Sequence, residues 1–446
     1  MKLPRAGWLS LNPNRKGAAF EFVPLKRFQH QKNTFPGMII PVTLGHHTPA
    51  CVTVSRVKNK APSPHFIPTR IKVNAKNKIS LGPFVAILTS DGGSPFRGNH
   101  INFADIIRTG RKMGVTVFVI TPHSILSAKE NIKGYLLDHQ TKLIKWKPAI
   151  LPLPDVVYNR IPNRRAEQTA VAQKAIKTLQ QVKQIPIYNY SFFNKWALYR
   201  ELSQSEELKS FLPKTTLLTG QQNLEDLLKD YSILYLKPVE GKAGIGMMRL
   251  IRLNNGYHLA HQSSKQKKHY RKKNLAEVWS AIQKLTHDRP YIAQEGVQLA
   301  TYHNQPFDIR MLLQKNGNGK WERSGTGIRI AGETAISTHV PMGGRIEDVQ
   351  TVFQHAFPED KEQILKNLEE TGILFAQTIE SNQNTILGEI SIDFGVEKNG
   401  DIWFFEANSK PMKFDEPAIR QKSLQRIIQY SLYLSGYEQS IEEVTS

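Results

Sequence analysis

The feature that most constrains this chain is a candidate β-hairpin in residues 385–410, near its C-terminus. Two runs of alternating polar and apolar residues flank an Asn-Gly pair at 399–400, which is the strongest short-range signal for a two-residue hairpin turn. With that turn, Asp393 lies directly opposite Glu406, and Asn408 points to the same side. The sequence therefore predicts two facing carboxylates on one face of a hairpin.

The two faces of this hairpin differ in polarity, which predicts that one of them packs into a core. The expected apolar face consists of Ile390, Ile392, Phe394, Val396, Trp403, Phe405 and Ala407. On the polar face, Asp393 and Glu406 would have their Cβ atoms about 5 Å apart. Two carboxylates at that separation repel each other unless a positive charge lies between them.

The polar face has two explanations. Asp393, Glu406 and Asn408 offer only oxygen ligands, which suit Mg²⁺ or Mn²⁺ rather than zinc. Alternatively, the face is a solvated surface that neighbouring Lys or Arg side chains neutralise. No Lys or Arg shares this face between Glu389 and Asn408, and Lys398 lies beside the turn, so the pattern favours the metal.

A glycine-rich loop occurs in residues 232–248. A strand pattern ends at Lys237, glycines follow at Gly241, Gly244 and Gly246, and a second strand pattern comes next. The loop is neither a Walker A motif nor a dinucleotide fingerprint, because GxxxxGK[ST] is absent and no helix follows. It fits a flap whose backbone N–H groups approach phosphate, with the lysine as a point charge. An ordinary hairpin loop with an exposed lysine is the alternative.

Residues 84–120 read as strand, helix and strand, which indicates a βαβ unit. The loop after the first strand contains Phe96, Arg97 and Asn99. Ligands commonly bind at this edge of a parallel sheet, so Arg97 is a candidate to hold an acidic substrate. A plain surface loop explains the same residues equally well.

Composition limits the class of protein. A chain of 446 residues with 40% hydrophobic and 22% charged residues indicates two or three folded domains. The single cysteine, Cys51, excludes an internal disulfide and a cysteine-based zinc site, and it favours a reducing compartment. We find neither a signal peptide nor a run of 18 apolar residues, so we expect a cytoplasmic protein without a membrane span.

The chain is strongly basic, with 60 Lys and Arg against 38 Asp and Glu and a formal charge of +22. Such a balance is compatible with an acidic partner such as nucleotide, nucleic acid or an acidic polymer. The densest basic run, residues 265–273, is predicted to be a solvated loop. A nucleic-acid binder is one hypothesis, but no zinc finger, RNP1-like or helix-turn-helix pattern supports it.

The order of these motifs resembles the ATP-grasp superfamily and, more closely, the YheC/YheD family of endospore coat-associated proteins. The resemblance covers roughly residues 80–435. The matching segments are GPFVAILTSDGGSPFRGN, VVYNRIPNRR, FFNKW, YLKPVEGKAGIGM, FDIRMLLQK, GTGIRIA and GEISIDFGVEKNGDIWFFEANSKP.

The resemblance implies a role for each matching position. ATP phosphates would contact Lys195, Lys237 and the loop glycines Gly241, Gly244 and Gly246. A hinge that holds adenine through its backbone would consist of Gln294, Glu295, Gly296 and Val297. Many ATP-grasp flaps carry Ser or Thr where this chain has Ala243, so its phosphate contacts would depend on backbone N–H groups.

The same resemblance implies the catalytic groups. Arg310 and Arg329 would steady the transferring phosphate or an acylphosphate, and Asp393, Glu406 and Asn408 would hold Mg²⁺, with Mn²⁺ as an alternative. Ion-paired surface arginines are the simpler explanation for Arg310 and Arg329.

The expected fold is α+β with α/β parts: an ATP-grasp fold preceded by a βαβ pre-ATP-grasp domain and a small β-rich domain. The expected ranges are 190–440, 81–189 and 1–80 respectively. The resemblance implies an ATP-dependent carboxylate–amine or thiol ligase associated with sporulation and the spore coat. Its partners would be a small-molecule or peptide carboxylate, an amine acceptor and other coat proteins. The alternative is a coat or assembly protein that binds nucleotide without turnover.

Overall fold

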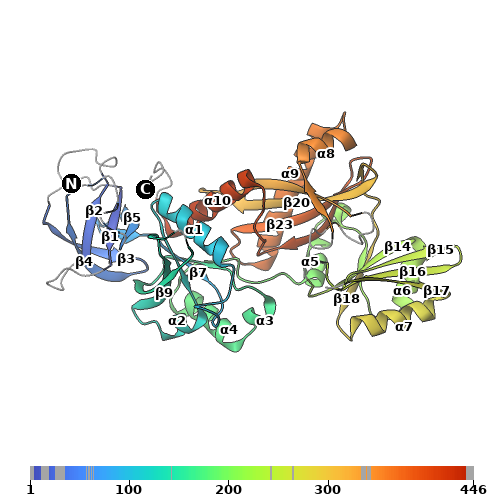
Figure 1. Cartoon of the computed structure of the whole chain (residues 1–446), viewed down its shortest axis with the longest axis horizontal. Coiled ribbons are helices and arrows are strands. Elements are labelled where there is room, and N and C mark those ends of the chain that lie inside the picture. The colour runs from blue at the N-terminus through green and yellow to red at the C-terminus, as the bar shows by residue number, and fades with distance from the viewer. Residues whose placement is uncertain are drawn as a thin grey trace.

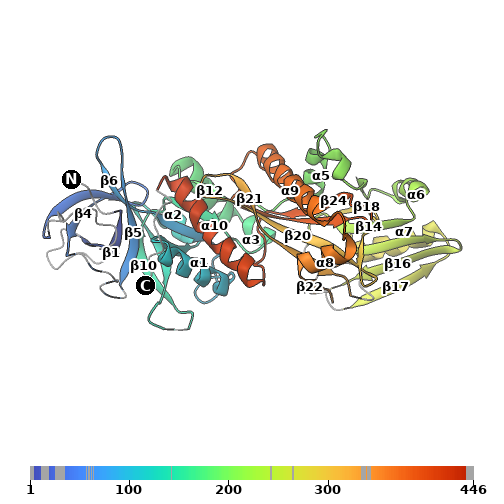
Figure 2. The same cartoon turned by 90° about the horizontal axis from the view of Figure 1, so that it is seen from above.

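The computed structural model arranges the chain as four β-sheets with helices between them (Figure 1). It describes residues 5–11, 20–25, 36–56, 58, 61, 63, 65–141, 143–241, 244–263, 266–332, 338 and 343–437. The molecule is elongated, with the first sheet at one end, the third at the other and the fourth between the second and third (Figures 1 and 2). The mixed α and β fold predicted from the sequence is confirmed.

The first sheet is a closed barrel with strand order β1-β2-β4-β3-β6-β5. Its strands are β1 (Ala6–Ser10), β2 (Phe20–Pro24), β3 (Ile39–Leu44), β4 (Thr48–Val54), β5 (Phe66–Val73) and β6 (Ile79–Gly82). Leu9, Val52 and Leu81 are among its buried side chains. The β-rich region predicted for the first 80 residues therefore takes the form of a barrel, which leaves no unpaired sheet edge.

The second sheet has the strand order β10-β9-β8-β7-β11-β12 and contains the predicted βαβ unit. Its elements are β7 (Phe84–Leu88), α1 (His100–Lys112), β8 (Thr116–Ile120), α2 (Pro122–Ser127), β9 (Asn131–Leu137), β10 (Trp146–Pro152), β11 (Val156–Asn159), α3 (Arg164–Glu167), α4 (Ala170–Lys177), a π-helical turn (Thr178–Val182) and β12 (Ile187–Tyr188). Strands β7 and β8 are parallel and α1 connects them, as the sequence predicts.

The third sheet has the order β13-β18-β14-β15-β16-β17. Its elements are β13 (Thr215–Leu217), α6 (Gln221–Asp230), β14 (Ile233–Pro238), β15 (Met248–Leu253), β16 (Gly256–Gln262), β17 (Lys267–Lys272), α7 (Leu275–Thr286) and β18 (Tyr291–Glu295). Helices α6 and α7 cover one face through an apolar core that includes Leu224, Leu250 and Val278 (Figure 1).

The predicted loop at residues 265–273 is wrong for most of its length, because Lys267–Lys272 is an edge strand of this sheet. Lys265 lies outside the described residues. The physical reason is that Tyr270 packs against the apolar core beneath the sheet. A single aromatic residue within a run of basic residues is a weak strand signal in the sequence. Basic side chains are also common on edge strands, where they discourage pairing with another chain.

The fourth sheet has the order β22-β21-β20-β23-β24, with β19 paired to β20. Its elements are α5 (Lys195–Leu202), a 3₁₀ turn (Lys209–Phe211), β19 (Thr301–Tyr302), β20 (Gln305–Lys315), β21 (Trp321–Ile330), β22 (Arg345–Glu347), α8 (Val349–Ala356), α9 (Lys361–Gln383), β23 (Glu389–Val396), β24 (Ile402–Asn408) and α10 (Pro417–Ser435). Helix α10 packs on α1, and its Ile427 and Ile428 join the core of the second sheet. None of the helices in the described ranges is long and apolar enough to cross a membrane.

The predicted hairpin is present as β23 and β24, and Asp393 does face Glu406. Its turn, however, is one residue longer than expected: Glu397 and Asp401 close it, with Gly400 at a φ of 89°. A register shift between Asp393 and Phe394 then restores the expected pairing.

This bulge corrects the predicted apolar face of β24. Ala407 enters the core as predicted, but Ile402 and Phe404 enter it in place of the predicted Trp403 and Phe405. Phe405 instead covers Gly395, which shares the polar face with Asp393. Bulges add one residue to one strand and redirect the side chains beyond it.

Candidate functional site

A cavity of about 210 Å³ lies between the face of the third sheet opposite its helices and the polar face of the fourth sheet. Its walls come from strands β14, β15, β18, β20, β21, β23 and β24, which are far apart in sequence. The lining residues are Tyr235, Lys237, Met247, Arg249, Gln294, Glu295, Val297, Leu299, Pro306, Asp308, Arg329, Ala331, Thr338, Asp393, Phe405 and Glu406. The cavity thus brings together seven of the residues selected from the sequence: Lys237, Gln294, Glu295, Val297, Arg329, Asp393 and Glu406.

Asp393 is the centre of an ion-pair network at the floor of this cavity. Arg310 binds it with two hydrogen bonds of 2.9 and 3.0 Å, and Arg329 approaches its other side at 2.8 Å. The carboxylate is only 2% exposed. Burial raises the pKa of Asp393, but attraction by Arg310 and Arg329 outweighs burial and holds this pKa below its ordinary value.

Asp308 is a member of this network that sequence reasoning missed. Arg329 binds it through hydrogen bonds of 2.8 and 2.6 Å, and the hydroxyl of Thr338 donates to it as well. Asp308 and Arg310 stand at alternate positions of β20 and therefore point to one face of the sheet. That alternation was visible in the sequence and could have identified Asp308 as a partner of the arginines.

Glu406 joins helix α5 to the hairpin. Lys195, the first residue of α5, forms an ion pair with Glu406, and the amide of Asn408 donates to the other carboxylate oxygen at 3.3 Å. Asn194 caps the helix by accepting hydrogen bonds from the N–H groups of Trp196 and Ala197, which fixes the start of α5 and hence the position of Lys195.

Lys237 is the second lysine of the site. It lies near the end of β14, and its ammonium group donates to the Gln294 side chain at 2.5 Å, while Gln294 donates to Thr215 at 2.9 Å. Burial lowers the pKa of Lys237 to about 8, with repulsion by Lys195 opposing the attraction of Glu406. A partly desolvated lysine of this kind gains most from an anion placed beside it.

The cavity holds a slight excess of positive charge. Three cationic side chains line it, Lys237, Arg249 and Arg329, and two more, Lys195 and Arg310, pair with its carboxylates from outside the lining. These five cations face four lining carboxylates, Glu295, Asp308, Asp393 and Glu406. The cations that separate the two facing carboxylates come from β20, β21 and α5, so the lack of Lys or Arg within the hairpin did not by itself require a metal.

The donor set nevertheless fits a hard divalent cation. Asp393, Glu406 and Asn408 present carboxylate and amide oxygens on one face of β23 and β24, and Mg²⁺ prefers such ligands together with substrate phosphates. In the described ranges, no group of three or more His, Cys, Asp or Glu side chains is clustered for metal binding, so any metal would need oxygens from a bound ligand. That requirement is usual for magnesium at phosphate-transfer sites.

The glycine loop connects the antiparallel strands β14 and β15, as the sequence predicts. Gly244 and Gly246 have φ values of 71° and 83°, a region that favours glycine. The N–H of Gly246 donates to the carbonyl of Gln262 at 2.7 Å, so this amide already has a partner. Gly241 is the third residue of the loop, and Ala243 lies outside the described residues.

The predicted hinge consists of the last two residues of β18, Gln294 and Glu295, and the two residues that follow it. The N–H groups of Glu295 and Gly296 donate to the carbonyls of Lys214 and Ile233, at 2.9 and 2.8 Å. The N–H of Val297 donates to no acceptor in the described part of the chain, so this hinge amide is available to a ligand. Beside it, apolar side chains that sequence reasoning missed form the walls: Met247, Leu299 and Phe405, with Tyr235.

The candidate substrate residues of the second sheet have structural roles. Phe96 is buried and stacks on His100, and Asn99 caps α1 by accepting from the N–H of Asn102 at 3.0 Å. Nearby, Arg160, which follows β11, forms an ion pair with Glu389 at 3.1 Å and donates to the carbonyl of Pro411. The backbone of Arg97 forms an isolated β-bridge with that of Ser90, across the loop that follows β7.

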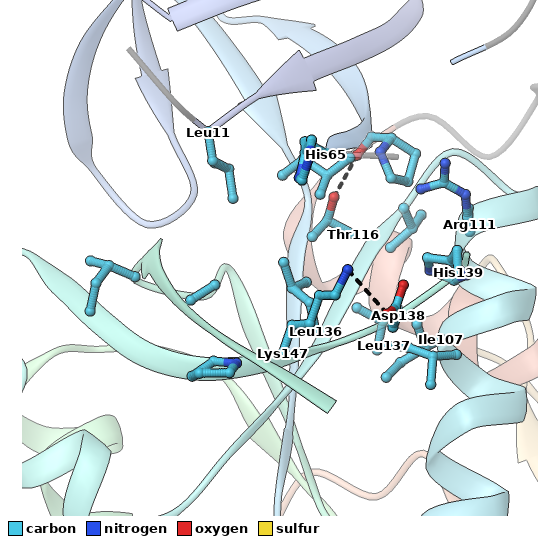
Figure 3. Close-up of a pocket in the computed structure, with 17 residues that line it drawn as sticks. Leu11, His65, Ile107, Arg111, Thr116, Leu136, Leu137, Asp138, His139 and Lys147 are labelled. Atoms are coloured by element: carbon cyan, nitrogen blue, oxygen red, sulfur yellow. Dashed lines mark hydrogen bonds and ion pairs between the residues drawn. The ribbon is translucent and has the colours of Figure 1, made fainter. Parts of the chain in front are cut away.

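A second cavity, of about 440 Å³, lies between the barrel and the second sheet (Figure 3). Four of its polar side chains are already paired: Lys147 with Asp138 at 3.1 Å, Thr116 with the carbonyl of Pro68, and Arg111 with that of Phe66. Such pairing gives this groove a structural role at the junction of the two sheets. The cavity around Asp393 is the better candidate for a reaction site.

Comparison with known proteins identifies the family of the part of the chain that contains the cavity around Asp393. Residues 184–434 match the family model described as YheC/D-like ATP-grasp. The chain belongs to this family. The ATP-grasp match contains the third and fourth sheets and every residue of the cavity.

Relatives and solved structures resemble this YheC/D-like chain over most of its length. The endospore coat-associated protein YheD of Bacillus subtilis (strain 168) is 29% identical over 80% of this chain and 80% of that protein. The endospore coat-associated protein YheC of the same organism is 21% identical over 69% of this chain and 84% of that protein. A crystal structure of D-alanyl-alanine synthetase A from Vibrio cholerae matches with a TM-score of 0.48 and 14% identity, covering 80% of this chain and 99% of that one.

Proposed function

We propose that this YheC/D-like protein is an ATP- and Mg²⁺-dependent ligase that joins a carboxylate to an amine or a thiol. The observation that carries the proposal is a facing carboxylate pair, Asp393 and Glu406, in a cavity lined by Lys237 and Arg329. Lys195 and Arg310 form ion pairs with the same two carboxylates. A site that binds a polyanion and transfers phosphate needs this excess of cations over acids.

The position of each residue in the cavity suggests which part of ATP or which metal ion it binds. Lys237, near the end of β14, and Lys195, at the start of α5, bind the phosphates of ATP, and Val297 with the apolar wall holds the base. Lys195 exchanges its ion pair with Glu406 for one with phosphate when nucleotide enters. Glu406 and Asn408, with Asp393, would hold Mg²⁺, which would neutralise phosphate charge.

The reaction proceeds through an acylphosphate. A substrate carboxylate oxygen attacks the γ-phosphorus, ADP leaves, and the amine or thiol then attacks the activated carbonyl and releases phosphate. Arg310 and Arg329 lie on the same network and stabilise the negative charge that develops in both steps. Neither step needs a nucleophile from the protein.

Calorimetry of ATP binding tests this proposal, with and without Mg²⁺, on the wild type and on Glu406→Gln. We expect Mg²⁺-dependent binding that the substitution weakens. The control is Asp401→Asn, which removes a carboxylate from the exposed turn of the same hairpin and leaves binding unchanged. An ADP-release screen across amino acids and peptides then identifies the acceptor and donor.

The named relatives suggest a second function. Both B. subtilis relatives are described as endospore coat-associated, which fits an assembly protein that binds nucleotide without turning it over. Tight Mg²⁺-dependent ATP binding with no ADP release for any amine or thiol acceptor would favour that function. Absence of any binding at millimolar ATP would refute both.

A further inference from the structure

The face of the third sheet that lines the nucleotide cavity continues outward as a basic surface. Cross-strand pairs place His269 level with Ala260 and Arg249, and Arg271 level with His258 and Ile251. Lys267 follows at the next alternate position of β17. We define the basic face as Arg249, His258, Lys267, His269 and Arg271.

The basic face contains no compensating acid. None of its five side chains forms an ion pair with a carboxylate in the part of the chain that the structure describes. The Nε atom of Arg249 is buried and has no hydrogen-bond partner among the described residues. An unpaired buried donor costs free energy, which a ligand that accepts from it would recover.

Repulsion within the basic face adds to burial in lowering two of its pKa values. Burial lowers the pKa of Lys267, and repulsion by Arg249 adds to it. Burial also lowers the pKa of His258, assisted by His269 and the cations Arg249, Arg271 and Lys267. The rings of His258 and His269 stack with 5.1 Å between centroids, and one nitrogen of each lies 3.0 Å from the other. An anion on this face would relieve the repulsion.

Three residues of the basic face, Lys267, His269 and Arg271, lie on β17, the strand at the open edge of the sheet. Strand β17 is the last strand of its sheet and pairs only with β16 among the described strands (Figure 1). The hydrogen bond from the Ser263 N–H to the Gln266 carbonyl shows which residues of β17 are hydrogen-bonded to β16, because hydrogen-bonded and non-hydrogen-bonded pairs alternate along two antiparallel strands. Lys268, Tyr270 and Lys272 therefore direct their backbone groups to β16, and Lys267, His269 and Arg271 direct theirs to the open edge.

We propose that this edge docks an extended acidic peptide, which adds to β17 as a further strand beside the nucleotide cavity. Strand addition supplies backbone hydrogen bonds from the open edge. Residues two apart along a strand are about 6.8 Å apart, so acidic side chains at alternate peptide positions match Lys267, His269 and Arg271. The chain's charge of +22 favours an acidic partner in general.

A nucleic acid is the competing occupant, and the basic face suits it less well. Single-stranded nucleic acids stack their bases on exposed aromatic rings that alternate with cations. Here Tyr270 points to the opposite face, into the core beneath the sheet, and His258 and His269 stack on each other. The alternating N–H and C=O groups of the open edge match the backbone of an added strand, whereas a phosphate could use only the N–H donors.

The test is fluorescence anisotropy with a labelled peptide of alternating Glu and Thr, added to the full-length protein. Lys267→Gln/Arg271→Gln should raise its Kd about tenfold, because two exposed ion pairs are lost. The matched control is Lys268→Gln/Lys272→Gln, which removes the same charge from the same strand but from the helix-covered face. It should raise Kd less than about threefold.

Two further probes decide the mode and the partner. A version of the peptide with N-methyl groups on alternate residues should bind at least about tenfold more weakly, because it cannot complete the strand ladder. Equal effects of the two double variants, undiminished binding of the N-methylated peptide, or tighter binding of oligothymidylate would each overturn the proposal. ATP calorimetry on the double variants, with wild-type affinity expected, shows that the neighbouring site is intact.

Discussion

Replacing Arg329 by Met is the sharpest test of the ion-pair network. The guanidinium is 6% exposed and bridges Asp308 and Asp393, so its removal leaves two buried carboxylates with fewer partners. Removing one partner of a buried ion pair typically lowers the free energy of unfolding by about 3–5 kcal/mol. Because Arg310 still pairs with Asp393 in the variant, we expect a loss of about 3 kcal/mol. Attraction by Asp308 and Asp393 overcomes burial and raises the pKa of Arg329, so it is charged at all relevant pH values.

Strand β21 provides a matched control in Arg323. Its side chain is 43% exposed and forms an ion pair with Glu369 at 2.7 Å. An exposed pair of this kind contributes about 0–1 kcal/mol, so Arg323→Met should hardly change the unfolding free energy. Urea denaturation followed by tryptophan fluorescence compares the two variants, and the double variant Asp308→Asn/Arg329→Met should recover part of the loss.

The pH dependence adds a second readout. Because the pKa of Asp393 is depressed in the folded state, its contribution to stability is present above the unfolded pKa and is lost as the pH falls through the folded pKa. Arg329→Met removes one of the cations that depress the pKa of Asp393, so its deficit relative to wild type should shrink in acid. Equal losses for the Arg329 and Arg323 variants, or a deficit independent of pH, would refute the network as a source of stability.

The remaining predictions concern the phosphate side of the cavity. Since the pKa of Lys237 is about 8, ATP affinity should fall as the pH rises through 8, and Lys237→Arg should remove this dependence in calorimetric titrations. The same depressed pKa means that stability should increase from pH 8 towards the unfolded value near 10.4. Gly246→Ala should cost about 1–2 kcal/mol in thermal unfolding, because φ is 83° and the new Cβ would lie 3.0 Å from the Tyr291 hydroxyl. Gly241→Ala, in the same loop but without a positive φ, should cost markedly less.

The sequence predicted the pieces of the site that depend on local pattern. The hairpin with Asp393 opposite Glu406, the strand that carries Lys237, and the glycine loop between two strands all follow from alternation and turn residues, and all are present. These features are local because side-chain direction in a strand is set by the backbone of its immediate neighbours. The family was likewise readable from the order of short motifs.

The register of the hairpin shows where local reasoning fails. An Asn-Gly turn predicted the correct pairing at Asp393 only because a longer turn and a bulge cancel each other. The bulge places Phe405 in the cavity, and no feature of its own sequence marks it. A one-residue change in register reverses the faces, so such a detail depends on how the strand packs against the rest of the fold.

Sequence by itself determined the fold family, the hairpin carboxylates, the two lysines and the absence of any cysteine-based site. Only the tertiary structure decided that Arg310 and Arg329 neutralise Asp393, that Asp308 completes the network, and that the basic run is a strand with an open edge. Charge compensation and edge position depend on contacts between strands far apart in the chain. Pairing of that range is decided by burial and packing of the whole sheet, which a local pattern does not contain.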